Sequence, residues 1–253
     1  MPDSRRILIL GGTGEARALA AALATHPALT AVTSLAGRTA APVRPAGELR
    51  VGGFGGSEGL ADYLDEARIA AVVDATHPYA AAISRHAVEA CRLAGRPLLR
   101  LERPPWQPQP GDRWVEVDSL QAAAAVAPGL GRRAFLAIGA KGIEAFAGVR
   151  EMWFLLRLVD RPAAPPPLAD CEILLARGPF DAAAETALLR RHRIDVVIAK
   201  NSGGEAAYGK IAAARALGLP VLLLRRPDLP SAETVQSVDQ VIAWIDLHPA
   251  TRA

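Results

Sequence analysis

Residues 5–19 are Arg5-Arg6-Ile7-Leu8-Ile9-Leu10-Gly11-Gly12-Thr13-Gly14-Glu15-Ala16-Arg17-Ala18-Leu19. This pattern predicts a buried strand, a tight glycine turn and a helix. Glycines let a backbone come close to a pyrophosphate, and the positive end of the following helix attracts its charge. Arg17 stands at the third glycine position of G-x-G-x-x-G, so the standard dinucleotide fingerprint is incomplete. An ordinary strand-to-helix turn is the alternative interpretation.

Strands alternate with helices along the rest of the chain. The first half predicts strands at 6–10, 31–35, 49–51, 70–74 and 98–101, with helices at 15–23, 57–66 and 80–93. The second half predicts strands at 114–117, 134–138, 153–158, 172–176, 195–199 and 221–224, with helices at 120–126, 143–147, 181–191, 205–217 and 238–247. Such alternation is typical of parallel sheets covered by helices.

A proline-rich run at 103–111 interrupts this alternation. Proline cannot donate to a β-ladder, so we expect a domain boundary there. The predicted fold class is therefore α/β, with two Rossmann-like or flavodoxin-like domains of parallel strands. The domains are expected at residues 1–108 and 109–253, with an active-site cleft between them.

Composition narrows the function classes. Hydrophobic residues make up 51% of the 253 residues and charged residues 22%, as in globular proteins. No apolar run reaches the length of a membrane span, so we expect no membrane contact and a cytoplasmic location. We also expect a monomer. The net charge is +3 and the basic residues are scattered along the chain, which does not indicate nucleic-acid binding. The cysteines and histidines lack metal-ligand spacing, so no metal site is predicted.

The three lysines stand out among 29 basic residues. Lys141 and Lys200 fall in loops that follow predicted strands, and Lys210 lies on the next helix. Ligands of open parallel sheets collect at these loops. Lysine supplies a compact ammonium where arginine would supply a planar fork. The alternative interpretation is that three lysines remain by chance.

Three further loops carry polar or glycine-rich motifs. Arg38 follows the second strand, where an NAD-binding fold presents an acidic residue, and Arg38 with Thr39 suits a 2′-phosphate instead. Residues 51–57 hold four glycines around one aromatic ring, which fits either backbone approach to a ligand or a hinge. His77, in the loop that follows Asp74, is a candidate for ligand contact or a structural histidine.

Four motifs together resemble the precorrin-6A reductase family of corrin biosynthesis. They are Gly11-Gly12-Thr13-Gly14-Glu15-Ala16, Val51-Gly52-Gly53-Phe54-Gly55-Gly56, Asp74-Ala75-Thr76-His77-Pro78-Tyr79-Ala80 and Lys200-Asn201-Ser202-Gly203-Gly204. The resemblance extends over nearly the whole chain and is weakest between residues 103 and 170. It implies a reductase that uses NADPH to reduce a double bond of precorrin-6A, giving precorrin-6B on the way to cobalamin.

The resemblance and the loop positions together assign roles to residues. The first domain is expected to bind NADPH through Gly11, Gly12, Thr13, Gly14, Glu15, Arg38, Thr39, Gly53, Thr76 and His77. The second is expected to bind the polycarboxylate tetrapyrrole, with Tyr79 added from the first, through Lys141, Arg177, Lys200, Asn201, Ser202, Gly203, Gly204, Tyr208 and Lys210. The candidate proton donors are His77, Lys200 and Tyr208, with water as the alternative.

Two other functions stay open. One is the cobalt-containing branch of the same pathway, with a cobalt-precorrin-6A substrate and NADH as the cofactor. Arg38 argues against that branch, because it favours NADPH. The other is a non-catalytic, NADP-binding regulatory module.

Overall fold

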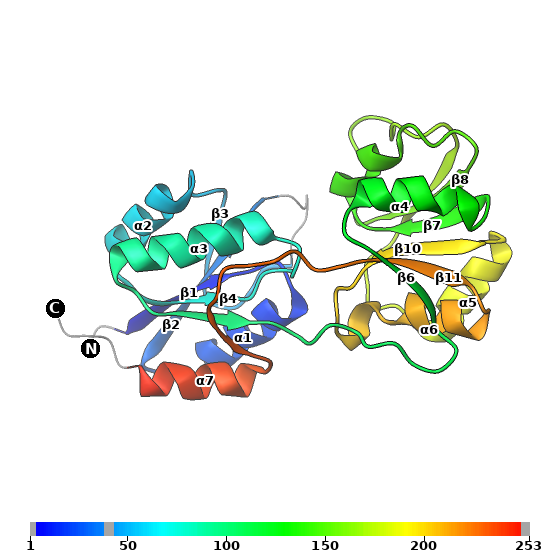
Figure 1. Ribbon diagram of the computed structural model, residues 1–253. Coiled ribbons are helices and arrows are strands. Elements are labelled where there is room, and N and C mark those ends of the chain that lie inside the picture. Colours follow the sequence, from blue (N-terminus) through cyan, green and yellow to red (C-terminus); the bar gives the residue numbers. More distant parts are fainter. Residues whose placement is uncertain (1–3, 38–42, 249–253) are drawn as a thin grey trace. The chain divides into compact units, whose positions relative to one another are not determined.

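The structure is a computed structural model that describes residues 4–37 and 43–248. The chain divides into two compact units, which we call unit 1 (residues 1–104 and 227–253) and unit 2 (residues 105–226). Each unit contains one six-stranded sheet, and all neighbouring strands in both sheets are parallel. The predicted α/β class with parallel sheets is confirmed (Figure 1).

Unit 1 has the strand order of a Rossmann fold. Its strands are β1 (Arg5–Leu10), β2 (Leu29–Leu35), β3 (Glu48–Val51), β4 (Ile69–Asp74), β5 (Leu98–Leu101) and β12 (Glu233–Val235). They lie in the order β3-β2-β1-β4-β5-β12, which is the dinucleotide-binding order of six parallel strands. The order reverses between β1 and β4, which makes this pair the topological switch point.

Helices cover both faces of the unit 1 sheet. They are α1 (Gly14–Ala24), α2 (Ser57–Glu66), α3 (Ala81–Ala94) and α7 (Val238–Leu247). Helices α1 and α7 pack together on one face, and α2 and α3 on the other (Figure 1). Ile7 and Ile9 pack in the core under α1 and α7, whereas Leu8 and Leu10 pack in the core under α2 and α3. This burial on both sides explains why β1 is apolar at successive positions.

Unit 2 repeats the arrangement with a different chain order. Its strands are β6 (Arg113–Val117), β7 (Arg133–Ala137), β8 (Trp153–Leu158), β9 (Cys171–Leu175), β10 (Val196–Lys200) and β11 (Pro220–Leu224). They lie in the order β9-β8-β7-β10-β11-β6. This is a circular permutation of the unit 1 order, because the sixth position is filled by β6, the first strand of the unit in the sequence. The switch point lies between β7 and β10.

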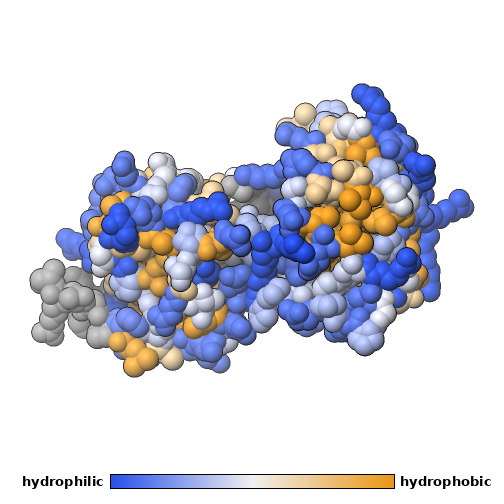
Figure 2. Space-filling model, in the orientation of Figure 1, coloured by the Kyte–Doolittle hydropathy of each residue, from blue (hydrophilic) through white to orange (hydrophobic). Residues whose placement is uncertain are grey.

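The helices of unit 2 cover its two faces unequally. They are α4 (Leu120–Val126), η1 (Ala127–Gly129), η2 (Ala140–Phe146), α5 (Ala182–Arg191), η3 (Glu205–Ala207) and α6 (Gly209–Ala216), with η marking 3₁₀ helices. Helices α5 and α6 pack together on one face, and α4 packs with η2 on the other. Figure 2 shows apolar side chains gathered over the region of α4 and β6, where Val115 and Val126 are exposed.

The domain boundaries differ from the sequence-based expectation. The first crossing between units lies at 104/105 instead of 108, because Trp106 already packs in the core of unit 2. The second unit also ends at Arg226 and does not extend to residue 253. Strand β12, which was not predicted, pairs with β5 and brings α7 back to unit 1.

Two predicted helices have a different form. The segment expected as a helix at 143–147 is a 3₁₀ helix that begins at Ala140. The helix expected at 205–217 is divided into η3 and α6, which begins at Gly209. A Cβ atom at Gly209 would lie 2.4 Å from the carbonyl oxygen of Phe180, so this position requires glycine at a close approach between segments.

Candidate active site

The glycine turn lies at the switch point of unit 1, where open α/β sheets bind their ligands. Thr13 caps α1: the Ala16 N–H donates to its hydroxyl at 3.1 Å. The same hydroxyl donates to the Ala75 carbonyl oxygen at 2.7 Å, which ties this turn to the loop after β4. The hydroxyl of Thr13 is therefore engaged within the protein both as a donor and as an acceptor.

The glycines of the turn leave its backbone bare. A Cβ atom at Gly11 would lie 3.0 Å from the Cγ2 atom of Thr33, so a larger residue would press on β2. Gly12 has φ +111°, with no heavy atom within 4 Å of where its Cβ would be. A Cβ at Gly14 would meet only the Arg17 guanidinium, at 3.8 Å. The turn and the N-terminus of α1 thus form an open cradle that fits a pyrophosphate.

Glu15 adds a negative charge to the first turn of α1, and Arg103 compensates it. The Glu15 carboxylate and the Arg103 guanidinium are 2.7 Å apart. Burial opposes ionisation of Glu15, but hydrogen bonds from its own backbone N–H and from Arg103 hold its pKa below the usual value. Sequence reasoning missed Arg103, which follows β5 and directly precedes Pro104-Pro105.

The loop after β4 is organised by a buried carboxylate. Asp74 is 2% exposed, and its Oδ1 atom accepts from the N–H of Thr76 at 3.2 Å and from its hydroxyl at 2.7 Å. Its Oδ2 atom lies 3.7 Å from Nε of Arg100, which is itself buried. Asp74 thus fixes the position of Thr76, the expected cofactor contact.

His77 and Tyr79 follow in the same loop. The Tyr79 N–H donates to Nδ1 of His77 at 3.2 Å, so this nitrogen carries the lone pair and Nε2 carries the proton of the neutral ring. The two rings lie 5.7 Å apart. In this tautomer Nε2–H is the hydrogen-bond donor of the ring, and a proton on Nδ1 would remove the acceptor of the Tyr79 N–H.

Gly53 lies in the loop after β3, next to a stacked cation. The Arg50 guanidinium donates to the carbonyl oxygens of Gly52 and Gly53, both at 2.8 Å. It also lies 3.8 Å above the Phe54 ring centroid and 5.0 Å from that of Tyr63. These contacts favour an ordered glycine loop over the hinge interpretation. Arg38 and Thr39 lie outside the described residues, so the structure says nothing of their contacts.

At the switch point of unit 2, the structure brings two of the three lysines together. Lys200 ends β10, and Lys141 lies on η2, directly after β7. Burial lowers the pKa of Lys200, and the charge of nearby Lys141 lowers it further. Two ammonium groups at one sheet edge form a positive site suited to carboxylates.

The loop after Lys200 is held partly by its own residues. The side-chain amide of Asn201 is 8% exposed and bonds to the backbone of Trp106, so it is not positioned as a substrate contact. The hydroxyl of Ser202 donates to the Lys200 carbonyl at 3.3 Å. Gly203 and Gly204 have φ +69° and +71°, a conformation that favours glycine.

The remaining predicted substrate residues differ in their surroundings. Arg177 is exposed in the loop after β9. Tyr208 accepts a hydrogen bond from Arg215, which also pairs with Asp112 at 2.9 Å. Lys210 is 5% exposed, and its ammonium donates to the Ala207 carbonyl and lies 4.8 Å from the Trp106 ring centroid. The expectation that Lys210 contacts substrate therefore does not match its buried position.

Among the described residues, no group of three or more histidine, cysteine, aspartate or glutamate side chains is placed to hold a metal ion. No helix in the described part of the chain is long and apolar enough to span a membrane.

Comparison with known proteins gives matches over nearly the whole chain. A model of the family described as precorrin-6x reductase CbiJ/CobK matches residues 6–246. The chain belongs to this family. It is 55% identical to the precorrin-6A reductase of Rhodococcus erythropolis over 242 residues, which cover 95% of this chain and 97% of that protein.

A solved structure named CobK precorrin-6A reductase shares the fold of this family member. It has a TM-score of 0.93 and 47% identity, and the match covers 98% of each chain. A cobalt-precorrin-6A reductase of Salmonella typhimurium is 32% identical over 232 residues, 87% of each protein. The chain is thus more similar to these two proteins named for precorrin-6A than to this one named for its cobalt form.

Proposed function

We propose that this chain reduces a ring double bond of precorrin-6A with NADPH, giving precorrin-6B in cobalamin biosynthesis. The observation that carries the proposal is the match over almost the full length to a protein named precorrin-6A reductase, at 55% identity. The two Rossmann-type strand orders support it, since each provides one switch point for a ligand. Unit 1 would bind the cofactor and unit 2 the tetrapyrrole.

The residues of unit 1 fit a dinucleotide. The bare backbone at Gly12 and Gly14 and the N-terminus of α1 suit a pyrophosphate, and the pairing of Glu15 with Arg103 reduces the repulsion that a lone carboxylate would cause. Thr76, His77 and Gly53 would contact the rest of the cofactor. The choice of NADPH over NADH rests on Arg38 and Thr39 in the sequence, where a guanidinium and a hydroxyl suit a 2′-phosphate.

The cations of unit 2 fit a substrate that carries many carboxylates. Lys141 and Lys200 lie together at the switch point, and Arg177 is exposed in the loop after β9 of the same sheet. Charge-assisted hydrogen bonds from these groups would anchor the carboxylate arms. The backbone of Ser202, Gly203 and Gly204 would line the same site, and Tyr79 and Tyr208 would offer aromatic faces to the macrocycle.

Among the three candidate proton donors, we assign the proton to Lys200. NADPH, when bound, supplies a hydride to one carbon of the double bond. Nζ of Lys200 would donate a proton to the neighbouring carbon and recover it from solvent, which completes the addition of two hydrogens. A lowered pKa makes Lys200 a stronger acid than an ordinary lysine. Nδ1 of His77 already accepts from the Tyr79 N–H, and the Tyr208 hydroxyl bonds to Arg215.

The test compares four combinations of cofactor and substrate, each mixed with the purified protein. NADPH or NADH is mixed with precorrin-6A or its cobalt form, and cofactor oxidation is followed together with the absorption of the chromophore. We expect coupled changes mainly with NADPH and the metal-free substrate. A preference for the cobalt form with NADH supports the alternative branch. Cofactor binding without reduction of either substrate supports a regulatory module and contradicts the proposal.

A further inference from the structure

The chain enters and leaves unit 2 at two places, and both lie close to the loop of residues 201–204. It enters after Pro104 and leaves after Arg226. Trp106 is the second residue inside the first crossing, and Arg226 is the last residue before the second. Both contact the loop that follows Lys200. This loop follows Lys200, the residue to which we assign the proton.

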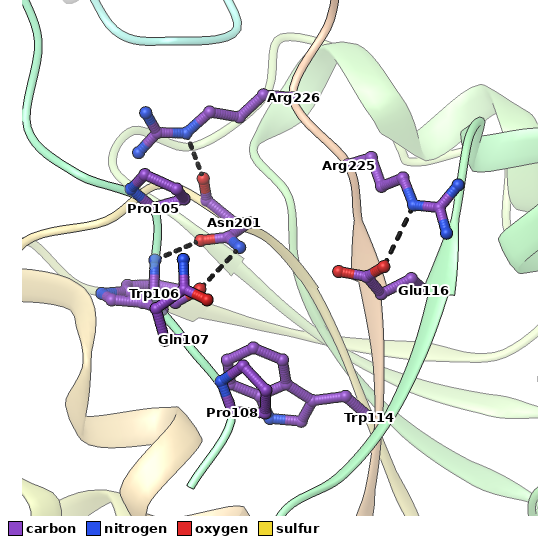
Figure 3. A pocket seen from close by; sticks show the side chains of 9 residues that line it. All are labelled: Pro105, Trp106, Gln107, Pro108, Trp114, Glu116, Asn201, Arg225 and Arg226. Atoms are coloured by element: carbon purple, nitrogen blue, oxygen red, sulfur yellow. Dashed lines mark hydrogen bonds and ion pairs between the residues drawn. The ribbon is translucent and has the colours of Figure 1, made fainter.

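Trp106 and Asn201 form a reciprocal pair. The Trp106 N–H donates to Oδ1 of Asn201 at 2.8 Å, and Nδ2 of Asn201 donates to the Trp106 carbonyl at 3.1 Å (Figure 3). Both residues are 8% exposed. A side-chain amide that both donates to and accepts from one backbone acts like a short piece of β-ladder. Asn201 therefore holds the entering segment at a fixed register, at the rim of a cavity of about 250 Å³.

The indole of Trp106 adds a second contact with the same loop. Its Nε1–H donates to the Gly204 carbonyl at 2.9 Å. The ring lies 5.7 Å from that of Tyr208 and below the Lys210 ammonium. The entering segment is thus joined to both ends of residues 201–204, through Asn201 and through Gly204.

Arg226 joins the leaving segment to the same residues. Its Nε–H donates to the Asn201 carbonyl at 3.0 Å (Figure 3). One terminal N–H donates to the Ser202 carbonyl at 3.2 Å. Asn201 is therefore engaged from both sides, by its side chain toward the entering segment and by its carbonyl toward the leaving one. Buried amides in such networks are costly to remove, because each partner is left unsatisfied.

We propose that Asn201 is a positioning residue, which holds residues 200–204 in their working conformation by fastening them to the segments that cross between the units. This proposal rests on the proposed function, in which that loop binds the tetrapyrrole. It replaces the expected substrate contact of the Asn201 amide with an indirect role. A change at Asn201 is then felt as weaker substrate binding, although the amide itself bonds to Trp106.

The test uses the full-length protein with three substitutions. Asn201→Ala removes both bonds to the Trp106 backbone. Trp106→Phe keeps those bonds, removes the indole bond to Gly204 and leaves a smaller ring beside Tyr208 and Lys210, so it remains informative if Asn201→Ala does not fold. Trp114→Phe is the matched control: Trp114 lines the same cavity, but its indole N–H has no partner among the described residues.

The first readout is hydrogen–deuterium exchange of the Trp106 amide, measured without ligands. Because its bond partner is the Asn201 side chain, exchange should be faster by about tenfold or more in Asn201→Ala. The exchange rate should increase less in Trp106→Phe, where it is measured at the amide of the new phenylalanine, and should stay unchanged in Trp114→Phe. Unchanged protection in Asn201→Ala overturns the proposed attachment.

The second readout is steady-state kinetics with precorrin-6A and NADPH. The KM for precorrin-6A should rise by about tenfold in Asn201→Ala and less in Trp106→Phe, with the dissociation constant of NADPH within about twofold of wild type. Faster exchange with an unchanged KM overturns the positioning role, as does an equal loss of NADPH affinity. Absence of turnover by the wild type contradicts the proposed function instead, and with it the substrate role of the loop, while the exchange result still decides the attachment.

Discussion

The hydroxyl of Thr13 donates a 2.7 Å hydrogen bond to the Ala75 carbonyl, and so joins the loops at the carboxyl ends of β1 and β4. The same oxygen accepts from the Ala16 N–H and caps α1. One buried side chain thus sets both the helix that would face a pyrophosphate and the loop that carries His77. Its removal should affect stability and cofactor binding together.

Substitution of Thr13 by valine should lower the free energy of unfolding by about 2 kcal/mol, since a cap and a buried hydrogen bond are both lost. Thr13→Ser keeps the hydroxyl and should lie near wild type. Urea unfolding measures the first effect, and titration with NADPH measures the second. If Thr13→Val binds NADPH as tightly as Thr13→Ser does, the turn is not the cofactor cradle.

Arg103 should support cofactor binding by neutralising Glu15. In Arg103→Ala the ionised Glu15 carboxylate remains at the N-terminus of α1 and repels the pyrophosphate, so the dissociation constant of NADPH should rise by about tenfold. Adding Glu15→Gln to Arg103→Ala should restore most of the affinity. Binding measured by calorimetry at low and high salt tests this. No rescue by the double substitution would mean that Arg103 acts in another way.

The lysine pair predicts a pH dependence. Lys200 donates a proton only when protonated, so the single-turnover rate should fall as the pH rises through its pKa, which lies below the ordinary 10.5. Lys141→Met removes a like charge, which should raise that pKa and move the alkaline limb to higher pH. Lys141→Arg keeps the charge and should leave the limb in place. A limb that is unchanged in Lys141→Met argues against Lys200 as the donor.

A buried ion pair should matter for the stability of unit 2. The Arg157 and Glu185 side chains are 7% and 5% exposed and lie 2.5 Å apart, and the guanidinium also lies 3.9 Å from the Phe180 ring centroid. Glu185→Ala leaves a buried cation unpaired and should cost about 3–5 kcal/mol. Urea unfolding measures the free energy of unfolding of Glu185→Ala. The double variant Arg157→Met/Glu185→Leu, which loses both charges, is measured for comparison. If Glu185→Ala lowers the free energy of unfolding by less than about 1 kcal/mol, the pair contributes no more than an exposed ion pair, which contradicts this prediction.

Much of the fold was predictable from the sequence because its signals are local. The apolar run before Gly11 and the alternation of strands and helices identify parallel sheets directly. Strand β12 was missed because it is three residues long, and its partner β5 lies more than a hundred residues earlier. A return of the chain to its first sheet leaves no local pattern, which is why the second unit was expected to run to the end.

The sequence allowed us to predict which loops form the candidate site, but not which of their side chains are free to contact a ligand. Loops at strand ends locate Gly11 and Lys200, but not whether a polar side chain already has a partner. Asn201 and Lys210 both looked available in the sequence, and both are buried against Trp106. Trp106 lies about a hundred residues before both of them, so spacing cannot identify this contact.

Isotope labelling follows the proposed hydride transfer from NADPH to the tetrapyrrole. The protein is mixed with precorrin-6A and NADPH carrying deuterium at the transferable position, and the product is analysed by mass spectrometry. We expect a tetrapyrrole heavier than the substrate by about three mass units, one hydrogen and one deuterium, with none of the label released into water. Oxidation of the cofactor without deuterium in the macrocycle, or an unchanged tetrapyrrole, would contradict it.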